Sequence, residues 1–198
     1  MSFEIRPYHP DDLDALYRIC LQTGDSGKDA TDLVEDTKLL GHYYMAPYVN
    51  FEPEICFVVV HNQALCGYII GCKSSSSFAL KCEKSWFPDL RLQYISPETS
   101  DLSYDARLKR LIHIGYQPRV EYVDYPAHLH INLLPATQGH GIGRKLITTF
   151  LKHLKALQIS GVHLEVSRSN ASAISFYEKL GFTAICEFEH SIGYGIKL

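Results

Sequence analysis

The N-terminal third of the chain carries apolar residues at helical spacing. Residues 4–6 form a short extended piece, and an amphipathic helix follows whose apolar positions recur at i, i+3, i+4 and i+7. These positions are Leu13, Leu16, Tyr17 and Cys20. A second helical pattern follows the glycine-containing stretch 24–30, and we expect Pro47 to end it. The residues on its apolar face are Leu33, Val34, Thr37, Leu40 and Tyr44.

Two short runs rich in β-branched and apolar residues come next, at 55–60 and 65–72. They are joined by His61-Asn62-Gln63-Ala64, so we predict a hairpin in the middle of a sheet.

The segment 73–122 carries no pattern from which a fold follows, and we interpret it as an insertion. Its serine run at 74–77 has low complexity, Trp86-Phe87-Pro88 is typical of a packed loop, and 105–113 has helical spacing.

The last third alternates strand and helix patterns. In order they are a strand at 128–134, a helix at about 144–157, a strand at 162–166, a helix at 171–180 and strands at 182–188 and 194–198. This order predicts an α/β domain with a mixed sheet. Because no repeat or linker divides the chain, we expect a single domain over 1–198.

Composition and charge narrow the class of protein. The 198 residues are 46% hydrophobic and 21% charged, which suits one soluble domain. No apolar run reaches the length of a membrane helix, and the first residues are acidic rather than basic, so we expect a cytoplasmic protein without a membrane partner. A net charge of -3 argues against nucleic acid as a partner. The six cysteines are scattered, which favours buried, reduced thiols.

A glycine-rich turn stands between a predicted strand and the long helix. It reads Gln138-Gly139-His140-Gly141-Ile142-Gly143. Free N–H groups at the positive end of a helix, without Cβ atoms in the way, favour a phosphate or pyrophosphate. Arg144 and Lys145 are poorly placed against the helix dipole unless an anion binds there. A glycine turn that only packs tightly fits the same residues about equally well.

The spacing of this turn excludes two common phosphate motifs. A P-loop requires Gly-Lys-Ser/Thr, whereas Gly143 is followed by Arg144-Lys145-Leu146. A dinucleotide fingerprint requires GxGxxG and an acidic residue at the end of the next strand, and Glu165 comes too early in that strand.

The stretches 128–149 and 164–182 together resemble the GNAT superfamily of acyl-CoA-dependent N-acetyltransferases. The first matches the Q/R-x-x-G-x-G/A motif, and the second, LEVSRSNASAISFYEKLGF, is similar to V-x-x-x-N-x-x-A-x-x-x-Y-E-K-L-G-F. Weaker matches at 5–21 and 57–71 extend the resemblance to about two thirds of the chain. YPAHLHINLLP and ISFYEKLGF also resemble a bacterial group related to the acetyltransferase-like C-terminal region of O-GlcNAc hydrolases.

The resemblance implies a GNAT fold and an activity. The fold is a mixed, mostly antiparallel sheet with a central parallel strand pair splayed at the cofactor site and helices on both faces. The activity is transfer of an acetyl group from acetyl-CoA to an amine of a small molecule or protein by direct attack, without a metal, in a monomer or homodimer. The alternative is a catalytically silent module that binds acetyl-CoA or CoA for sensing or docking.

The resemblance also implies roles for individual residues. A bulged strand would offer backbone groups to the pantetheine arm and stabilise the oxyanion, and its residues are Ile131, Asn132, Leu133 and Leu134. The pyrophosphate would meet Gln138, Gly139, His140, Gly141, Ile142, Gly143 and Arg144. Asn170 matches the asparagine that binds pantetheine, although it also suits a helix N-cap. Tyr177 matches the tyrosine that protonates the leaving sulfur.

The sequence leaves the general base and the acceptor open. The candidate bases are His128, His130, Glu165, Asp124 and Glu121. The two histidines are also a poor metal pair, because no third ligand is evident. A cluster of acidic residues either attracts a cationic amine or is solvated surface. Its members are Asp25, Asp29, Asp32, Glu35 and Asp36. One aromatic group either lines a pocket or fills the core of the insertion, and comprises Tyr43, Tyr44, Tyr48, Trp86, Phe87 and Tyr94.

Overall fold

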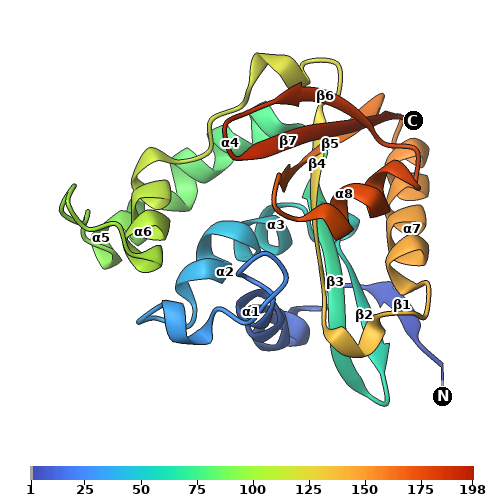
Figure 1. Ribbon diagram of the computed structural model, residues 1–198, viewed down its shortest axis with the longest axis horizontal. Helices are drawn as coiled ribbons and strands as arrows, with labels where there is room; N and C mark the ends of the chain where they lie inside the picture. The colour runs from blue at the N-terminus through green and yellow to red at the C-terminus, as the bar shows by residue number, and fades with distance from the viewer. Residues whose placement is uncertain (1) are drawn as a thin grey trace.

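The computed structural model describes residues 2–198, in which seven strands form one sheet of order β1-β2-β3-β4-β5-β7-β6 (Figure 1). The strands are β1 (Glu4–Pro7), β2 (Phe57–His61), β3 (Ala64–Cys72), β4 (Ala127–Leu133), β5 (Gly161–Ser167), β6 (Thr183–Glu187) and β7 (Ser191–Lys197). Only β4 and β5 pair in parallel, and every other neighbouring pair is antiparallel. The predicted mixed sheet with one parallel pair is therefore confirmed.

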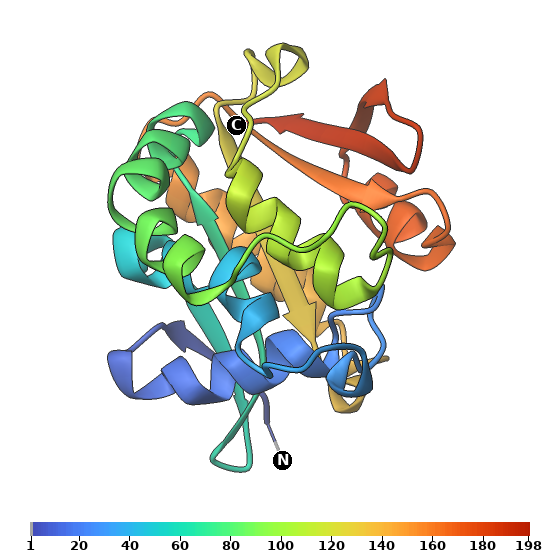
Figure 2. The ribbon, with the colours of Figure 1, turned by 90° about the vertical axis from the view of Figure 1, so that its left-hand side faces the viewer.

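Helices cover both faces of the sheet (Figures 1 and 2). The helices are α1 (Leu13–Gln22), α2 (Leu39–Tyr44), α3 (Ala46–Phe51), α4 (Ser75–Ser85), α5 (Phe87–Gln93), α6 (Tyr104–Ile114), α7 (Ile142–Ala156) and α8 (Ala171–Glu178). Helices α1 to α6 share one hydrophobic core with one face, and α7 and α8 share a second core with the other. Among residues 2–198, no helix has both the length and the apolarity needed to cross a bilayer.

The second predicted helix differs from the structure. The stretch 31–33 makes a single 3-10 turn, and regular helix begins only at Leu39. Pro47 does not end a helix but lies in the first turn of α3. The physical reason is that the first helical turn needs no N–H donor and suits the fixed φ of proline, so a proline there can start a helix as readily as stop one.

The segment 73–122 folds into α4, α5 and α6, which pack on the same face as α1 to α3. Ser74 is the N-cap of α4, since its hydroxyl accepts a hydrogen bond from the Ser77 N–H at 3.3 Å. The packed loop predicted at Trp86-Phe87-Pro88 is wrong, because α5 begins at Phe87 with Pro88 in its first turn.

Strands β4 and β5 diverge after a short common stretch. They pair only at Ala127 with Val162 and at His128 with His163, so the predicted splay is confirmed. The predicted bulge in β4 is wrong, because its register with β3 runs without a shift from His128 to Leu133. The separation is possible without a bulge because β5 pairs along its whole length with β7 and follows that strand instead of β4.

Candidate active site

The divergence of β4 and β5 opens a cavity of about 470 Å³, which we call the splay cavity. It brings together several of the residues predicted for cofactor binding and catalysis, namely Ile131, Asn132, Leu133, Asn170 and Tyr177. Leu134 and the glycine turn do not line it. The cavity therefore lies between β4 and α8, whose two sequence motifs are about forty residues apart in the chain.

Successive residues of β4 direct their backbone N–H and C=O groups alternately toward β3 and toward β5. The N–H of Leu134 donates to the carbonyl of Cys66 at 2.9 Å, so it is not free for a ligand, contrary to expectation. Because backbone groups of an antiparallel strand alternate in direction, Asn132 also turns its backbone toward β3. Ile131 and Leu133 then direct theirs into the splay, where β5 no longer pairs with them.

The glycine turn leaves β4 through a 3-10 turn at Pro135–Thr137 and leads into α7. Gly139 and Gly141 have φ of 76° and 68°, and a Cβ on either would point into open space. Gly141 is the N-cap of α7 without a side-chain cap, so the first N–H groups of the helix remain available. Gly143 is different, because its Cβ would lie 3.0 Å from the Phe176 ring.

The polar residues around this turn are exposed. Gln138, His140 and Arg144 all lie at the surface, and the Arg144 guanidinium donates to the Lys179 carbonyl at 3.3 Å. The turn thus packs against the end of α8. It presents free backbone N–H groups to solvent next to Leu133, which lines the splay cavity.

Helix α8 supplies the two other predicted residues. Asn170 caps the helix by accepting a hydrogen bond from the Ala173 N–H at 3.0 Å, and the residue also lines the splay cavity. Tyr177 is 8% exposed, and burial raises the pKa of its phenol well above 10. Its hydroxyl hydrogen-bonds no group within residues 2–198, so its proton is available to a ligand in the cavity.

The opposite wall of the splay cavity was missed in the sequence analysis. It comes from the end of α1 and the loop after it, and includes Thr23, Gly24, Ser26 and Gly27. The Asn132 amide donates to the Thr23 hydroxyl at 2.6 Å and ties this loop to β4. In the sequence, Gly24 and Gly27 are the residues that indicate a sharp turn here, and Gly27 has φ of 92°.

A second cavity of about 580 Å³ adjoins the first, and we call it the acceptor-side cavity. The two share Tyr44, Leu129, His130, Leu164 and Glu165. Its remaining lining includes tyrosines from α3 and from the stretch after α6, namely Tyr48, Tyr116 and Tyr122. Sequence reasoning did not find the stretch 115–119, which forms part of this wall.

Three imidazoles line the acceptor-side cavity, from His128 and His130 on β4 and His163 on β5. Burial lowers the pKa of all three, to about 4 for His130 and well below its usual value for His128. The His163 Nδ1 donates to the Tyr125 carbonyl at 2.6 Å, and its ring stacks on Tyr122 at 3.9 Å. At neutral pH these rings are therefore uncharged.

Glu165 is the acidic residue of this site, and its oxygens are already bound. One oxygen lies 3.1 Å from the Arg119 guanidinium and 3.0 Å from the Tyr122 hydroxyl, and the other lies 3.1 Å from Ser191. Glu121 and Asp124, also proposed as bases, are exposed and line neither cavity.

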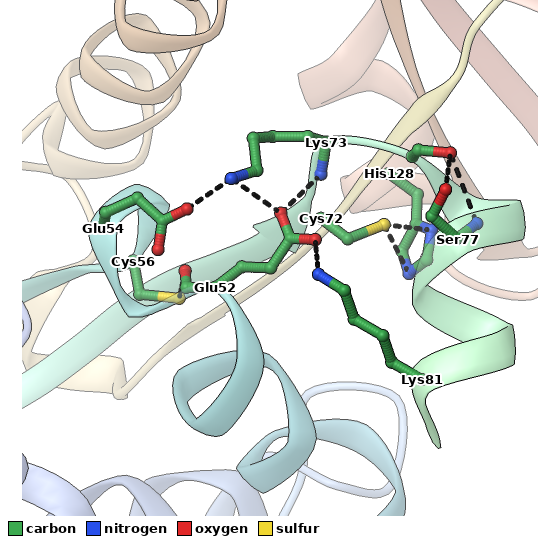
Figure 3. A network of polar contacts seen from close by, with 9 residues as sticks. Glu52, Glu54, Cys56, Cys72, Lys73, Ser77, Lys81 and His128 are labelled. Atoms are coloured by element: carbon green, nitrogen blue, oxygen red, sulfur yellow. Dashed lines mark hydrogen bonds and ion pairs between the residues drawn. The ribbon is translucent and has the colours of Figure 1, made fainter. Parts of the chain in front are cut away.

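Figure 3 shows the polar network in which His128 of β4 meets Cys72 of β3, with the carboxylate of Glu52 nearby. The Cys72 sulfur lies 3.2 Å from Nδ1 and 3.8 Å from Nε2 of His128. Beside it, the buried Glu52 carboxylate accepts hydrogen bonds from the Lys73 N–H at 2.9 Å and from Lys81 at 3.4 Å. Within residues 2–198, no three His, Cys, Asp or Glu side chains group as a metal site requires.

The acidic and the aromatic candidates for the acceptor site differ in where they lie. None of the acidic residues between 25 and 36 lines either cavity. Tyr43, Tyr44 and Tyr48 line the acceptor-side cavity, whereas the other three aromatic residues, Trp86, Phe87 and Tyr94, pack in the core with α4 to α6. Five of the six cysteines are buried, and all six are unpaired, as expected.

Comparison with known proteins agrees with this geometry. The model of the acetyltransferase (GNAT) family matches residues 27–182. Protein O-GlcNAcase of Rattus norvegicus is 25% identical over 190 residues, which cover 94% of this chain and 21% of that protein. The chain thus spans about a fifth of that relative's length, and the resemblance expected from two short segments is confirmed.

Solved structures share the fold. The crystal structure of SsHAT superposes with a TM-score of 0.92 at 34% identity, covering 100% of this chain and 98% of the other. The PaiA N-acetyltransferase of Thermoplasma acidophilum, solved in complex with coenzyme A, superposes with a TM-score of 0.58 at 17% identity and covers 100% of both chains.

Proposed function

The chain belongs to the acetyltransferase (GNAT) family, and from that premise we propose that it transfers the acetyl group of acetyl-CoA to an amine. The observation that carries the proposal is the splay cavity, which holds unpaired backbone of β4 and a buried phenol, together with the open glycine turn between β4 and α7. Each of these features suits a different part of acetyl-CoA.

The pantetheine arm is an extended chain with two amides, and Ile131 and Leu133 offer it strand-like hydrogen bonds from the free edge of β4. Asn170, the N-cap of α8, lines the same space. At the far end, the N–H groups of Gly141 to Gly143 and the positive end of the α7 dipole suit the pyrophosphate. A protein of the same fold, the PaiA N-acetyltransferase of Thermoplasma acidophilum, was solved in complex with coenzyme A.

Tyr177 is the proposed general acid. When the amine attacks the thioester carbonyl and the C–S bond breaks, the sulfur needs a proton. Burial raises the pKa of Tyr177, so its phenol is protonated at every physiological pH, and we assign it as the donor of that proton because it lines the cavity without another hydrogen-bond partner within residues 2–198. A backbone N–H of Ile131 or Leu133 is the proposed donor to the oxyanion.

The acceptor enters through the acceptor-side cavity in this proposal. Its three imidazoles are uncharged at neutral pH, and its Glu165 carboxylate is neutralised by Arg119. With little net charge and a wall of tyrosines, the cavity favours a small amine with an apolar body over a strongly basic peptide.

The test is calorimetric titration with acetyl-CoA and CoA, run beside ATP and NAD, followed by a panel of amines assayed for released thiol. We expect micromolar binding of acetyl-CoA with ATP and NAD silent, and acetylation of apolar primary amines. Failure to bind acetyl-CoA overturns the proposal. Binding without acetylation of any amine would instead identify the silent CoA-binding module.

A further inference from the structure

We propose that His130 takes the proton of the acceptor amine and that a chain of hydrogen-bonded side chains holds its ring in the tautomer required. The chain consists of Tyr48, His128 and Ser75. The catalytic part of this inference rests on the proposed acetyl transfer, whereas the tautomers are a property of the protein alone.

The Tyr48 hydroxyl joins the two imidazoles. It projects from α3, is 1% exposed, and lies 2.8 Å from Nε2 of His128 and 3.1 Å from Nε2 of His130. A hydroxyl has one proton and two lone pairs, so when that proton goes to one ring, the oxygen accepts from the other. Since both rings are uncharged, one carries its proton on Nε2 and the other on Nδ1.

The contacts of Ser75 indicate which ring carries its proton on Nδ1. Its hydroxyl lies 2.7 Å from Nδ1 of His128 and 3.0 Å from the carbonyl of Pro126. A carbonyl only accepts, so the arrangement that makes both of these hydrogen bonds sends the serine proton to Pro126, and the serine oxygen accepts the Nδ1 proton of His128. Nε2 of His128 then accepts from Tyr48, whose oxygen accepts from Nε2 of His130.

This order leaves Nδ1 of His130 with a free lone pair. The reverse order would put a proton on that nitrogen and would turn the Ser75 hydroxyl proton toward His128, at the cost of its hydrogen bond to the Pro126 carbonyl. The first order makes all four hydrogen bonds of the chain, whereas the reverse order makes three of them, so the first is favoured.

The Cys72 thiol does not compete for the His128 nitrogens. Its sulfur is nearly equidistant from both ring nitrogens, at 3.2 and 3.8 Å (Figure 3). A partner in the plane of the ring would approach one nitrogen and lie far from the other. The sulfur therefore sits over the ring face and leaves the in-plane positions to Ser75 and Tyr48.

His130 is also the imidazole that reaches both cavities, whereas His128 and His163 line only the acceptor-side cavity. The other ionisable groups facing it are Tyr44 from α2 and Glu165 from β5. Glu165 is engaged by Arg119, which leaves the imidazole as the unengaged acceptor at the junction.

The step balances as follows in protons and bonds. An N–H bond of the amine breaks and its proton moves to Nδ1 of His130, while the amine nitrogen bonds to the acetyl carbon. The C–S bond breaks, and the thiolate takes the proton of Tyr177. The imidazolium then releases its proton to water in the open cavity, and the phenolate of Tyr177 regains one.

Nitrogen-15 NMR of histidine side chains in the full chain tests the tautomers without any need for activity. At pH 7 we expect His130 as the Nε2–H form and His128 as the Nδ1–H form, both uncharged. The opposite tautomer at His130, or a charged ring, would overturn the inference even if the protein proves to be an acetyltransferase. The expected tautomers in a protein that acetylates nothing would sink only the proposed function.

Tyr48→Phe tests the chain, with Tyr68→Phe as its control. Tyr68 is equally buried but its hydroxyl has no partner within residues 2–198, and it lines neither cavity. We expect Tyr48→Phe to mix the His130 tautomers, lower kcat at least tenfold and shift the acidic limb of the pH–rate profile, while KM for acetyl-CoA stays within twofold. Tyr68→Phe should change none of these. Unaltered tautomers and kcat in Tyr48→Phe would refute the positioning role.

Discussion

Half-buried, uncharged imidazoles predict that the fold loses stability in mild acid. Burial lowers the pKa of His130 from 6.5 to about 4. Below pH 6.5 the unfolded chain therefore binds a proton that the folded chain does not bind until about pH 4. Because the unfolded state holds more protons across this window, the free energy of unfolding decreases as the pH falls through it.

The magnitude follows from these two values. Each pH unit inside the window corresponds to about 1.4 kcal/mol, so His130 alone removes about 2 kcal/mol between pH 7.5 and pH 5.0. His128 acts in the same direction, since burial lowers its pKa further. A loss of this size is a substantial part of the stability of an ordinary domain.

Urea unfolding at pH 7.5 and pH 5.0 measures the effect within each protein. Wild type should lose about 2 kcal/mol more than His130→Gln between the two pH values, because glutamine does not titrate. His190→Gln removes a histidine whose side chain is 88% exposed, and it should behave as wild type. An equal loss in wild type and His130→Gln would show that the folded state protonates this ring as easily as the unfolded chain does.

The other predictions concern the acid, the glycine turn and a helix cap. Tyr177→Phe should lower kcat at least tenfold while the Kd for CoA stays within a few-fold, and an unchanged rate on a verified amine removes this residue from the mechanism. Gly141→Glu should abolish CoA binding without unfolding the domain, because it places a negative side chain in the open space beside the turn, and retained affinity contradicts that assignment. Ser74→Ala should lower the free energy of unfolding by about 1 kcal/mol through loss of the α4 cap, whereas Ser76→Ala, inside the helix and exposed, should change it by less than about 0.5 kcal/mol in urea titrations.

The sequence predicted the parts of the fold that local patterns encode. The strand, glycine turn and helix around Gly141, and the strand and helix around Asn170, depend on short-range periodicity and caps, and they lie where expected. Prolines at 47 and 88 were misinterpreted because the same residue suits a helix start and a helix end. Only tertiary packing distinguishes the two.

Contacts between distant segments lay beyond sequence reasoning. His128 and His130 were recognised as candidates, but their shared partner Tyr48 is eighty residues away and belongs to a short helix with no motif of its own. The wall formed by Thr23 became evident only from its hydrogen bond with Asn132. Such pairings follow from how α1 and α3 pack on the sheet rather than from any local pattern.

The sparse pairing between β4 and β5 has a consequence for how the stability of the fold depends on its ligand. Direct backbone pairing between the two halves of the sheet is confined to two positions, at Ala127 and His128. Under the proposed function, acetyl-CoA laid into the splay bonds to the free edge of β4 as an additional strand would. A ligand at a hundred times its Kd stabilises a fold by about 2.7 kcal/mol. Loss of bound acetyl-CoA would thus lower the free energy of unfolding of this sheet, and protease resistance at rising acetyl-CoA concentration would measure the effect.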